Sequence, residues 1–436
     1  MTNASPPTTT WNVPERTTRL VLFYCWLAIL AEGYDIGVLG AVLPALAQDA
    51  DWGLSPLELG GLGAYALVGM LIGALFIGSL SDRLGRKRML LLSMIIFSAS
   101  QLAAALAPTP ELFGIFRLIG GLGMGGVIPV AAALTIEYSP PRKRSFNYAI
   151  MYSGYSLGIV VSALVAMMLL PVVGWRWVVA VGAIPLVLVP IIARGLPESL
   201  ESLVASGRMD QARSLAARLG IAPYEPVAPT PSAQAPWRRS LQALFSARYL
   251  RSTVFFWISL FCGMVLVYGL NTWLPSIMRQ AGYDLGSSLT FLLVFSLASA
   301  VGGIVLGWAA DRFGQKPILV IFYVLGGAGI LLLAMPSSLA VNLLFVAFAG
   351  VGSISTSLVL TGYIADYYPA EFRGTATGWA LSFARIGAIS GPLIGGWLAA
   401  AQVPFAWNFY AFAGVGVLAA IAVALIPARR EPAAGS

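Results

Sequence analysis

Two carboxylates lie near the middle of the first long apolar run of the sequence. The run extends over about residues 20–46, and about 20 apolar residues are enough to span the hydrocarbon core of a bilayer. Glu32 and Asp35 are three residues apart, so a helix presents both on one face. An acid at that depth costs about 2.5–3.5 kcal/mol on insertion scales and is rarely idle. The pair suits proton binding and release; the alternative is two satisfied polar residues that line a wet crevice.

Two arginines also lie inside apolar runs and could complement these acids. A buried arginine needs a partner, and the only acids near the depth of Arg117 are Glu32 and Asp35. The alternative is that Arg117, about 9 Å into its helix, extends to the outer interface. Arg385 lies about 15 Å into its run, close to the midplane, where a guanidinium could hold a substrate carboxylate.

Aromatic and amide side chains cluster in the runs that we expect to face the centre. Ordinary packing is the alternative for each aromatic residue, because aromatic side chains are generally well buried. Asn271 and Phe383 are the strongest candidates for a role beyond packing. The full set comprises Tyr152, Tyr155, Tyr268, Asn271, Trp273, Trp379 and Phe383.

The composition indicates the elements that position these residues. The chain has 436 residues, of which 58% are hydrophobic and 10% are charged, whereas a soluble domain carries about 25% charged residues. We therefore expect an all-α polytopic membrane protein with twelve transmembrane helices in two pseudo-symmetric six-helix bundles. The runs cover about residues 20–46, 57–80, 89–107, 111–138, 146–170, 176–193, 252–279, 287–310, 317–335, 339–366, 375–400 and 404–427.

The distribution of basic residues predicts the orientation. Of the 26 lysines and arginines, 22 fall in the tails and loops on one side of the predicted bundle. The loops of the other side hold only Arg176 and Arg279. Basic loops stay in the cytoplasm, so we expect both termini to be cytoplasmic, in the plasma membrane and specifically a bacterial inner membrane. The positive net charge of +8 is then a topology signal and not a nucleic-acid footprint.

Several function classes are excluded by what the sequence lacks. There is no histidine, and both cysteines, Cys25 and Cys262, lie in apolar runs, so neither a metal site nor a disulfide framework is expected. No nucleophile and base are visible for an enzyme. No phosphate-binding loop of the G-x-x-x-x-G-K-[ST] type is present, so the proton gradient is the expected energy source, and no cofactor is expected.

The predicted organisation has five parts. Residues 1–19 form a polar cytoplasmic tail, 20–194 the first bundle, 195–251 a cytoplasmic linker, 252–427 the second bundle and 428–436 a second cytoplasmic tail. Within the linker, residues 197–220 predict one amphipathic helix, 221–236 a Pro/Ala-rich connection and 237–251 a second basic amphipathic stretch.

The two halves repeat at an offset of 229 residues. The turn at residues 78–88 returns at 307–316, and Glu137 returns as Asp366. Parallel halves are typical of transporters that rock around a central site. The two membrane acids and the midplane arginine have no charged counterpart in the other half. Residues that break the repeat in this way are better candidates for function than for the shared scaffold. The residues that we expect to act as gates or latches are Gly78, Asp82, Arg83, Gly85, Arg86, Glu137, Arg144, Asp311, Arg312, Asp366 and Arg373.

These motifs resemble those of a known family. The loop at residues 78–88, GSLSDRLGRKR, resembles the signature loop of the major facilitator superfamily, and the resemblance covers about residues 18–428. Within that superfamily the chain looks like the aromatic acid:proton symporter family, although Glu32 replaces the usual aspartate of the first motif. The features that carry this resemblance are Glu32-Gly33-Tyr34-Asp35, Arg117 with its following glycines, Thr135-Ile136-Glu137-Tyr138, Pro197-Glu198-Ser199, and Arg385 with Gly391-Pro392.

The resemblance implies proton-coupled uptake of a benzoate, hydroxybenzoate or related carboxylate by alternating access. We expect Arg385 to bind the substrate carboxylate and Asp35 to take the proton, with Glu32 and Arg117 assisting, in a carrier that functions as a monomer in the lipid bilayer. The Gly-Tyr-Asp and Pro-Glu-Ser elements also resemble sugar porters. A sugar or other organic acid symporter and a proton-coupled drug exporter of the same fold remain alternatives, and a midplane arginine disfavours both uncharged sugars and cationic drugs.

Overall fold

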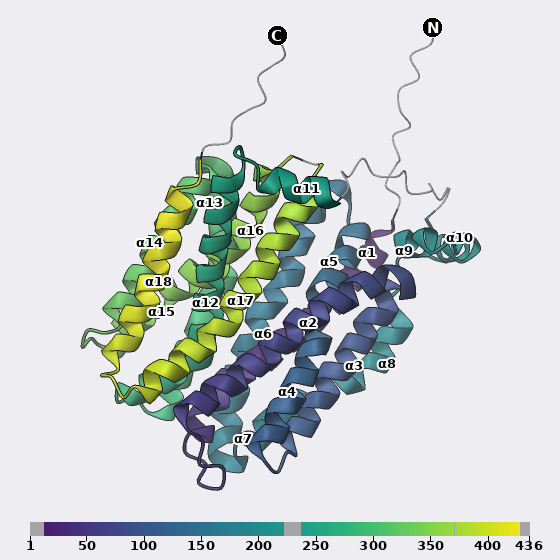
Figure 1. Cartoon of the computed structure of the whole chain (residues 1–436). Helices are drawn as coiled ribbons and strands as arrows, with labels where there is room; N and C mark the ends of the chain where they lie inside the picture. Colours follow the sequence, from purple (N-terminus) through teal and green to yellow (C-terminus); the bar gives the residue numbers. More distant parts are fainter. Residues whose placement is uncertain (1–12, 222–236, 370, 428–436) are drawn as a thin grey trace.

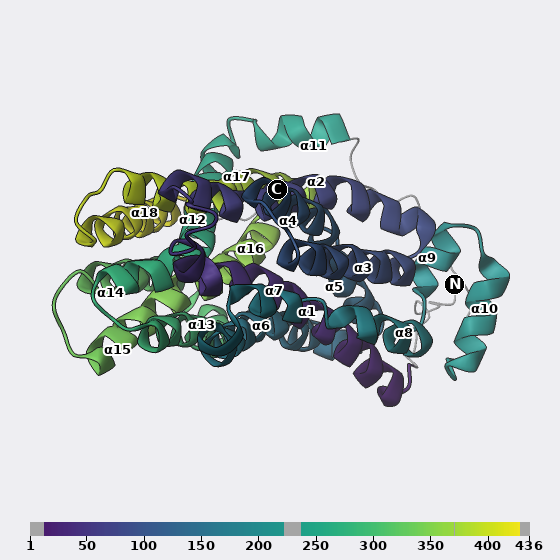
Figure 2. The same cartoon turned by 90° about the horizontal axis from the view of Figure 1, so that it is seen from below.

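The computed structural model describes residues 13–221, 237–369 and 371–427, apart from the side chains of residues 78, 79, 82, 83, 237, 238 and 240. Throughout these residues the regular structure is helical. Twelve of the described helical spans are long and apolar enough to cross a membrane, which confirms the expected fold class. Figures 1 and 2 show the spans as two groups of helices side by side.

The first six spans include two that are broken in the middle. Gly125 and Gly126 interrupt the fourth span, where they pack closely against α2, and residues 182–184 interrupt the sixth. The apolar pattern runs through both breaks, so it does not predict them. The helices are α1 (Glu15–Leu46), α2 (Pro56–Leu84), α3 (Arg86–Ala105), α4 (Pro110–Met124), α5 (Val127–Glu137), α6 (Arg144–Val173), α7 (Trp175–Val181) and α8 (Pro185–Gly195).

The last six spans contain one local irregularity. A π-helical turn, Val351–Ser355, lies within the tenth span. The helices are α12 (Leu250–Gln280), α13 (Leu285–Phe313), α14 (Gln315–Leu332), α15 (Leu339–Gly350), α16 (Thr356–Tyr367), α17 (Arg373–Ala400) and α18 (Ala406–Ala424).

The two ends of the bundle differ in how their helices begin. We call the end where α1 begins and α18 stops the basic end, because it carries most of the arginines and lysines. Here Gly85 (φ 104°) and Gly314 (φ 91°) make the turns after α2 and α13, a conformation that glycine adopts without strain. At the opposite end, hydroxyl and carboxylate side chains cap α2, α4, α13 and α15.

The connection between the halves differs from its prediction. One amphipathic helix is expected over residues 197–220, but the structure has two, α9 (Leu200–Ala205) and α10 (Met209–Arg218). Gly207 separates them with a φ of 74°, which is incompatible with a continuous helix. A further helix, α11 (Trp237–Leu244), precedes α12, and the Pro/Ala-rich part of the linker lies outside the described residues. Helices α10 and α11 lie outside the main bundle (Figure 2).

The halves meet through α1 with α12, α2 with α17, and α6 with α13. Their closest approaches lie toward the opposite end of the bundle, where glycines bring backbones together without intervening side chains. Figure 1 shows α2 and α17 converging at that end and separating toward the basic end. We call these contacts the seam; its residues are Gly40, Gly60, Gly63, Asn271, Pro392 and Gly396.

Candidate functional site

The acids at the centre of α1 are fully enclosed. Glu32 has an exposed fraction of 0% and Asp35 of 1%. Gly33 and Gly37 let the α1 backbone pack directly onto α6, beside Tyr155. This close packing fixes the position of both acids between the helices. The two acids nevertheless have different partners.

Asp35 is bound by an arginine inside the first half. The Arg117 guanidinium on α4 donates to the Asp35 carboxylate and, over 3.2 Å, to the Asp35 main-chain carbonyl. Arg117 is only 4% exposed, so it does not extend to the outer interface. A buried ion pair of this kind needs further hydrogen bonds to offset the loss of hydration.

A residue that sequence reasoning missed supplies part of that environment. Gln101 on α3 is buried, and its amide lies beside the Asp35 carboxylate. In the sequence this residue is a lone amide within the apolar run at residues 89–107, and an uncharged amide is not expected to need a partner as a charged residue does. Asp35 on α1 therefore has neighbouring polar side chains from α3 and α4, both in the first half.

Glu32 has a different environment. Both of its carboxylate oxygens are buried without a hydrogen-bond partner among the described residues. Arg385, which comes from α17 in the second half, interacts electrostatically with this carboxylate. The Arg385 guanidinium is partly buried, and its described contact is weak, at 3.9 Å from the sulfur of Met70 on α2. The structure thus brings the unpaired acid and the midplane cation near each other, from opposite halves, without a direct hydrogen bond.

Tyrosines surround this pair. Tyr152 and Tyr155 on α6 are stacked, with ring centroids 5.8 Å apart and an interplanar angle of 19°. Tyr268 on α12 interacts electrostatically with both tyrosines, and Tyr152 also interacts with Glu32 and Arg385. The cluster provides flat apolar surfaces next to an anion and a cation.

Asn271 lies one helical turn from Tyr268, toward the seam. Its amide donates to the Ile36 carbonyl across the two halves at 3.3 Å. Its Oδ1 is buried without a partner in the described part of the chain. Asn271 therefore joins the halves and keeps one free acceptor.

Two predicted substrate residues are not brought to this cluster. Phe383 packs on Trp257 and Phe261 of α12, and Trp379 stacks on Trp257 at 6.2 Å. A helix turns about 100° per residue, so Phe383 points to the side of α17 opposite Arg385. The aromatic residues of α17, Trp379, Phe383 and Trp397, share one helix face, and Arg385 lies about 200° from Phe383, so the spacing in the sequence already separates the two faces.

The side of α17 that carries Arg385 is open toward the basic end. Gly378 and Ser382 precede Arg385 by seven and three residues and therefore share its face, and both are exposed. The seam closes the other direction. The face of α17 is therefore not covered by other helices at these two positions between Arg385 and the basic end.

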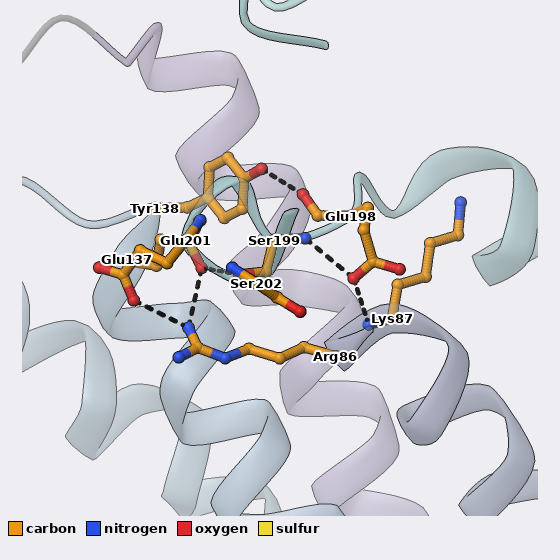
Figure 3. A network of polar contacts seen from close by, with 8 residues as sticks. All are labelled: Arg86, Lys87, Glu137, Tyr138, Glu198, Ser199, Glu201 and Ser202. Atoms are coloured by element: carbon orange, nitrogen blue, oxygen red, sulfur yellow. Dashed lines mark hydrogen bonds and ion pairs between the residues drawn. The ribbon is translucent and has the colours of Figure 1, made fainter. Parts of the chain in front are cut away.

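A second polar network lies at the basic end of the first half (Figure 3). Arg86 donates to Glu137 at 2.9 Å and to Glu201 at 3.0 Å. Ser199 also donates to Glu137, and Glu198 accepts from the main-chain N–H groups of Lys87 and Ser199. The start of α9 therefore holds the beginning of α3 and the end of α5 together.

The second half has a simpler version of this network. Gln315 donates to Asp366 at 2.8 Å, in the place of the Arg86–Glu137 pair. Asp311 and Arg312 are exposed, and the Nε of Arg373 donates to the Tyr368 carbonyl at 3.4 Å. Arg144 and Arg373 begin α6 and α17 at corresponding positions. The side chains of Asp82 and Arg83, and the surroundings of Gly78, lie outside the described part of the structure, so their predicted roles stay predictions.

Known proteins resemble this chain over most of its length. Residues 25–305 and 290–436 match the sequence model of the Major Facilitator Superfamily. A benzoate transport protein of Acinetobacter baylyi is 34% identical over 94% of this chain and 90% of its own length. A gentisate transporter of Corynebacterium glutamicum is 36% identical (92% and 86%), and a gallate transporter of Pseudomonas putida is 37% identical (86% and 84%).

Solved structures of low sequence identity share the fold. The inward-open xylose transporter XylE from E. coli superposes with a TM-score of 0.74 at 19% identity, covering 93% of this chain and 95% of that one. The nucleoside transporter NupG gives a TM-score of 0.70 at 16% identity, covering 94% and 99%.

Proposed function

This chain belongs to the major facilitator superfamily, within its family of aromatic acid transporters, and we propose that it carries an aromatic carboxylate into the cell together with protons. The observation that carries the proposal is the cluster of Arg385, Glu32 and three tyrosines at membrane depth. A cation without a hydrogen-bonded acid suits a carboxylate, and tyrosine rings suit an aromatic ring. The benzoate, gentisate and gallate transporters among its relatives support the same substrate class.

Substrate binding would use the charges that the described residues leave incompletely paired. A carboxylate that enters the membrane must lose hydration, and a fixed cation offsets that cost. The planar Arg385 guanidinium would donate two parallel hydrogen bonds to the substrate. Its attraction to Glu32 would then be replaced by an attraction to the substrate, and Glu32 would keep a buried charge without a partner unless it accepts a proton.

Proton coupling would involve both acids of α1. We assign Asp35 as the coupling site, since Arg117 holds its carboxylate in one place, with the Gln101 amide beside it. Glu32 is only three residues away and would share the proton when substrate occupies Arg385. Transport would then alternate between the present conformation, open at the basic end, and one in which the seam parts.

Uptake in proteoliposomes tests this function. With an imposed inward proton gradient, purified protein should accumulate labelled benzoate, gentisate or gallate, and an uncoupler should abolish the accumulation. Benzamide, xylose and a lipophilic cation are matched competitors that lack the carboxylate. Preferred transport of xylose or of the cation would replace this proposal by the sugar or drug alternative, and unchanged accumulation without a proton gradient would remove the coupling.

The proposed orientation places the basic end in the cytoplasm. Ala247→Cys at the basic end and Ala401→Cys at the opposite end are a matched pair, because both positions are exposed and both native cysteines are buried. An impermeant maleimide added to intact cells should label only the Ala401→Cys variant. Labelling of Ala247→Cys alone would reverse the orientation.

A further inference from the structure

A pocket outside the transport pathway lies where α3 begins and α8 ends. Its volume is about 720 Å³, and α9 and α10 form its remaining walls. Residues 86 and 195 are also the limits of two membrane-spanning segments. The pocket is therefore at the level where the chain leaves the bilayer, which is the level of lipid headgroups.

Positive charge dominates this pocket. Two acids, Glu198 and Asp210, also line it, but Glu198 accepts from main-chain N–H groups and Asp210 pairs with Arg213. The five cations that line it are Lys87, Arg88, Arg194, Arg208 and Arg218.

None of these cations forms a salt bridge with an acid among the described residues. The Lys87 main-chain N–H donates to the Glu198 carboxylate, and the Lys87 ammonium interacts with that carboxylate only electrostatically (Figure 3). Arg208 donates from Nε to Ser206, while its Nη2 is buried with no partner in the described part of the chain. Unpaired guanidinium and ammonium groups that converge on one pocket provide donors for an anion with several oxygens.

The two membrane-spanning helices that end at the pocket, α3 and α8, indicate which kind of anion it would bind. On α8, Val187, Ile191 and Arg194 have the spacing of one helix face, and all three side chains are exposed. This face presents apolar side chains along the membrane-spanning part and a cation at its end.

The neighbouring helix repeats the pattern. On α3, Arg88, Leu92 and Ile95 have the same spacing and are likewise exposed. Helices α3 and α8 pack against each other, and the apolar stripe of each helix leads to an arginine that lines the pocket. A molecule with two acyl chains and an anionic head matches this arrangement, whereas a free anion would use only the pocket.

We propose that this pocket binds the phosphate-bearing headgroup of an anionic phospholipid, with the acyl chains along the exposed stripes of α3 and α8. Basic pockets between transmembrane helices bind such headgroups in membrane proteins generally. The site is independent of the proposed transport function. Because α9 also contacts Arg86 and Glu137, a bound lipid would stabilise the network that joins α3 and α5.

The test measures lipid binding by purified full-length protein. Native mass spectrometry and thermal unfolding in detergent would compare phosphatidylglycerol, phosphatidylcholine and inorganic phosphate. Wild type should bind and be stabilised by phosphatidylglycerol selectively. The Arg88→Gln/Arg194→Gln variant should bind it about 25-fold more weakly, or about fivefold per cation, because a basic residue near an anionic surface contributes about 1 kcal/mol. The Arg248→Gln/Arg251→Gln variant removes two exposed cations from the same end outside the pocket and should bind like wild type.

Three outcomes would overturn the proposal. Equal weakening in both double variants would indicate diffuse attraction to the basic end. Equal stabilisation by inorganic phosphate at the same concentration would indicate a site for free anions. A photoactivatable phosphatidylglycerol, used with wild type so that folding of a variant is not at issue, should label peptides from α3, α8 or α10. Labelling restricted to other helices would also refute the site.

Discussion

The two halves of the chain share a backbone but divide the polar chemistry unequally. Gly85 and Gly314 make the same turn 229 positions apart. At that same offset, however, three of the charged residues buried in the first half correspond to apolar ones. Glu32, Asp35 and Arg117 correspond to Phe261, Met264 and Val346. The repeated positions build the shared backbone, and the positions that differ include the residues of the proposed site.

The contact between the halves shows the same division. Ser156 on α6 lies 3.1 Å from Ser299 on α13. The corresponding pair, 229 positions away in each case, is Arg385 on α17 and Met70 on α2. One side of the interface therefore has two hydroxyl groups and the other has a cation. The first half holds the acids and the second half contributes the cation, so the proposed coupling would need both halves together.

The largest effect is expected when the proposed coupling acid of the first half loses its charge, since the corresponding position of the second half has none. Asp35→Asn removes the charge that Arg117 binds while keeping the shape, so accumulation driven by a proton gradient should be lost and equilibrium binding of substrate should largely remain. Uptake and binding in proteoliposomes measure the two effects. Met264→Leu, at the corresponding site, is the control and should transport normally; accumulation by Asp35→Asn against a gradient would show that coupling lies elsewhere.

The next effect concerns the cation of the second half. Arg385→Ala should weaken binding of an aromatic acid about 10- to 100-fold, since a hydrogen bond to a charged group contributes about 1.5–3 kcal/mol. Arg385→Lys keeps the charge but loses the planar fork and should fall between Arg385→Ala and wild type. Isothermal titration calorimetry measures the affinities. Ser156→Ala is the matched control, and equal affinities for Arg385→Ala and wild type would remove this residue from the binding site.

A smaller effect is expected when the basic-end network of the first half is simplified. Arg86→Gln reproduces Gln315 and replaces the ion pairs to Glu137 and Glu201 with a neutral hydrogen bond. The thermal unfolding midpoint in detergent should fall, by an amount corresponding to about 1–3 kcal/mol, because Glu137 is buried. Exposed Arg142→Gln is the control for loss of charge, and an equal change in both variants would contradict a specific role for the network.

The smallest effect is expected for the reverse exchange. Gln315→Arg would create an ion pair with Asp366, but Asp366 is exposed whereas its counterpart Glu137 is buried, so stabilisation should stay below about 1 kcal/mol. Differential scanning fluorimetry of the single variant and of Gln315→Arg/Asp366→Asn would isolate the pair. A stabilisation as large as the loss in Arg86→Gln would mean that the two networks are equivalent.

Much of the fold could be predicted because membrane-spanning helices appear in the sequence as apolar runs of sufficient length. Twelve apolar runs predict the twelve spans, and the repeated motif predicts the two equivalent turns that contain Gly85 and Gly314. The breaks at Gly125–Gly126 and at Gly207 were not predicted, since hydropathy does not report where a helix bends. Local backbone conformation there depends on packing against neighbouring helices and on positive φ, which an apolar pattern does not encode.

The site was less predictable than the fold. The rule that a buried charge needs a partner led from Arg117 to the acids of α1, but it could not choose between Glu32 and Asp35. Gln101 was overlooked because an uncharged amide does not demand a partner as strongly as a charge does. Phe383 was favoured on residue type alone, and only the helical rotation of α17 shows that it points away from Arg385.

The glycine seam has an electrical consequence. Where Gly60 and Gly63 of α2 approach Gly396 and Pro392 of α17, the two helices come into direct contact. A voltage across a membrane falls where mobile ions are absent, so in this conformation most of the drop would lie across the seam. Moving one charge through the full drop exchanges about 2.3 kcal/mol per 100 mV. A proton that reaches Glu32 or Asp35 from beyond the seam would cross most of that voltage, so loading these acids should depend on the membrane potential as well as on pH.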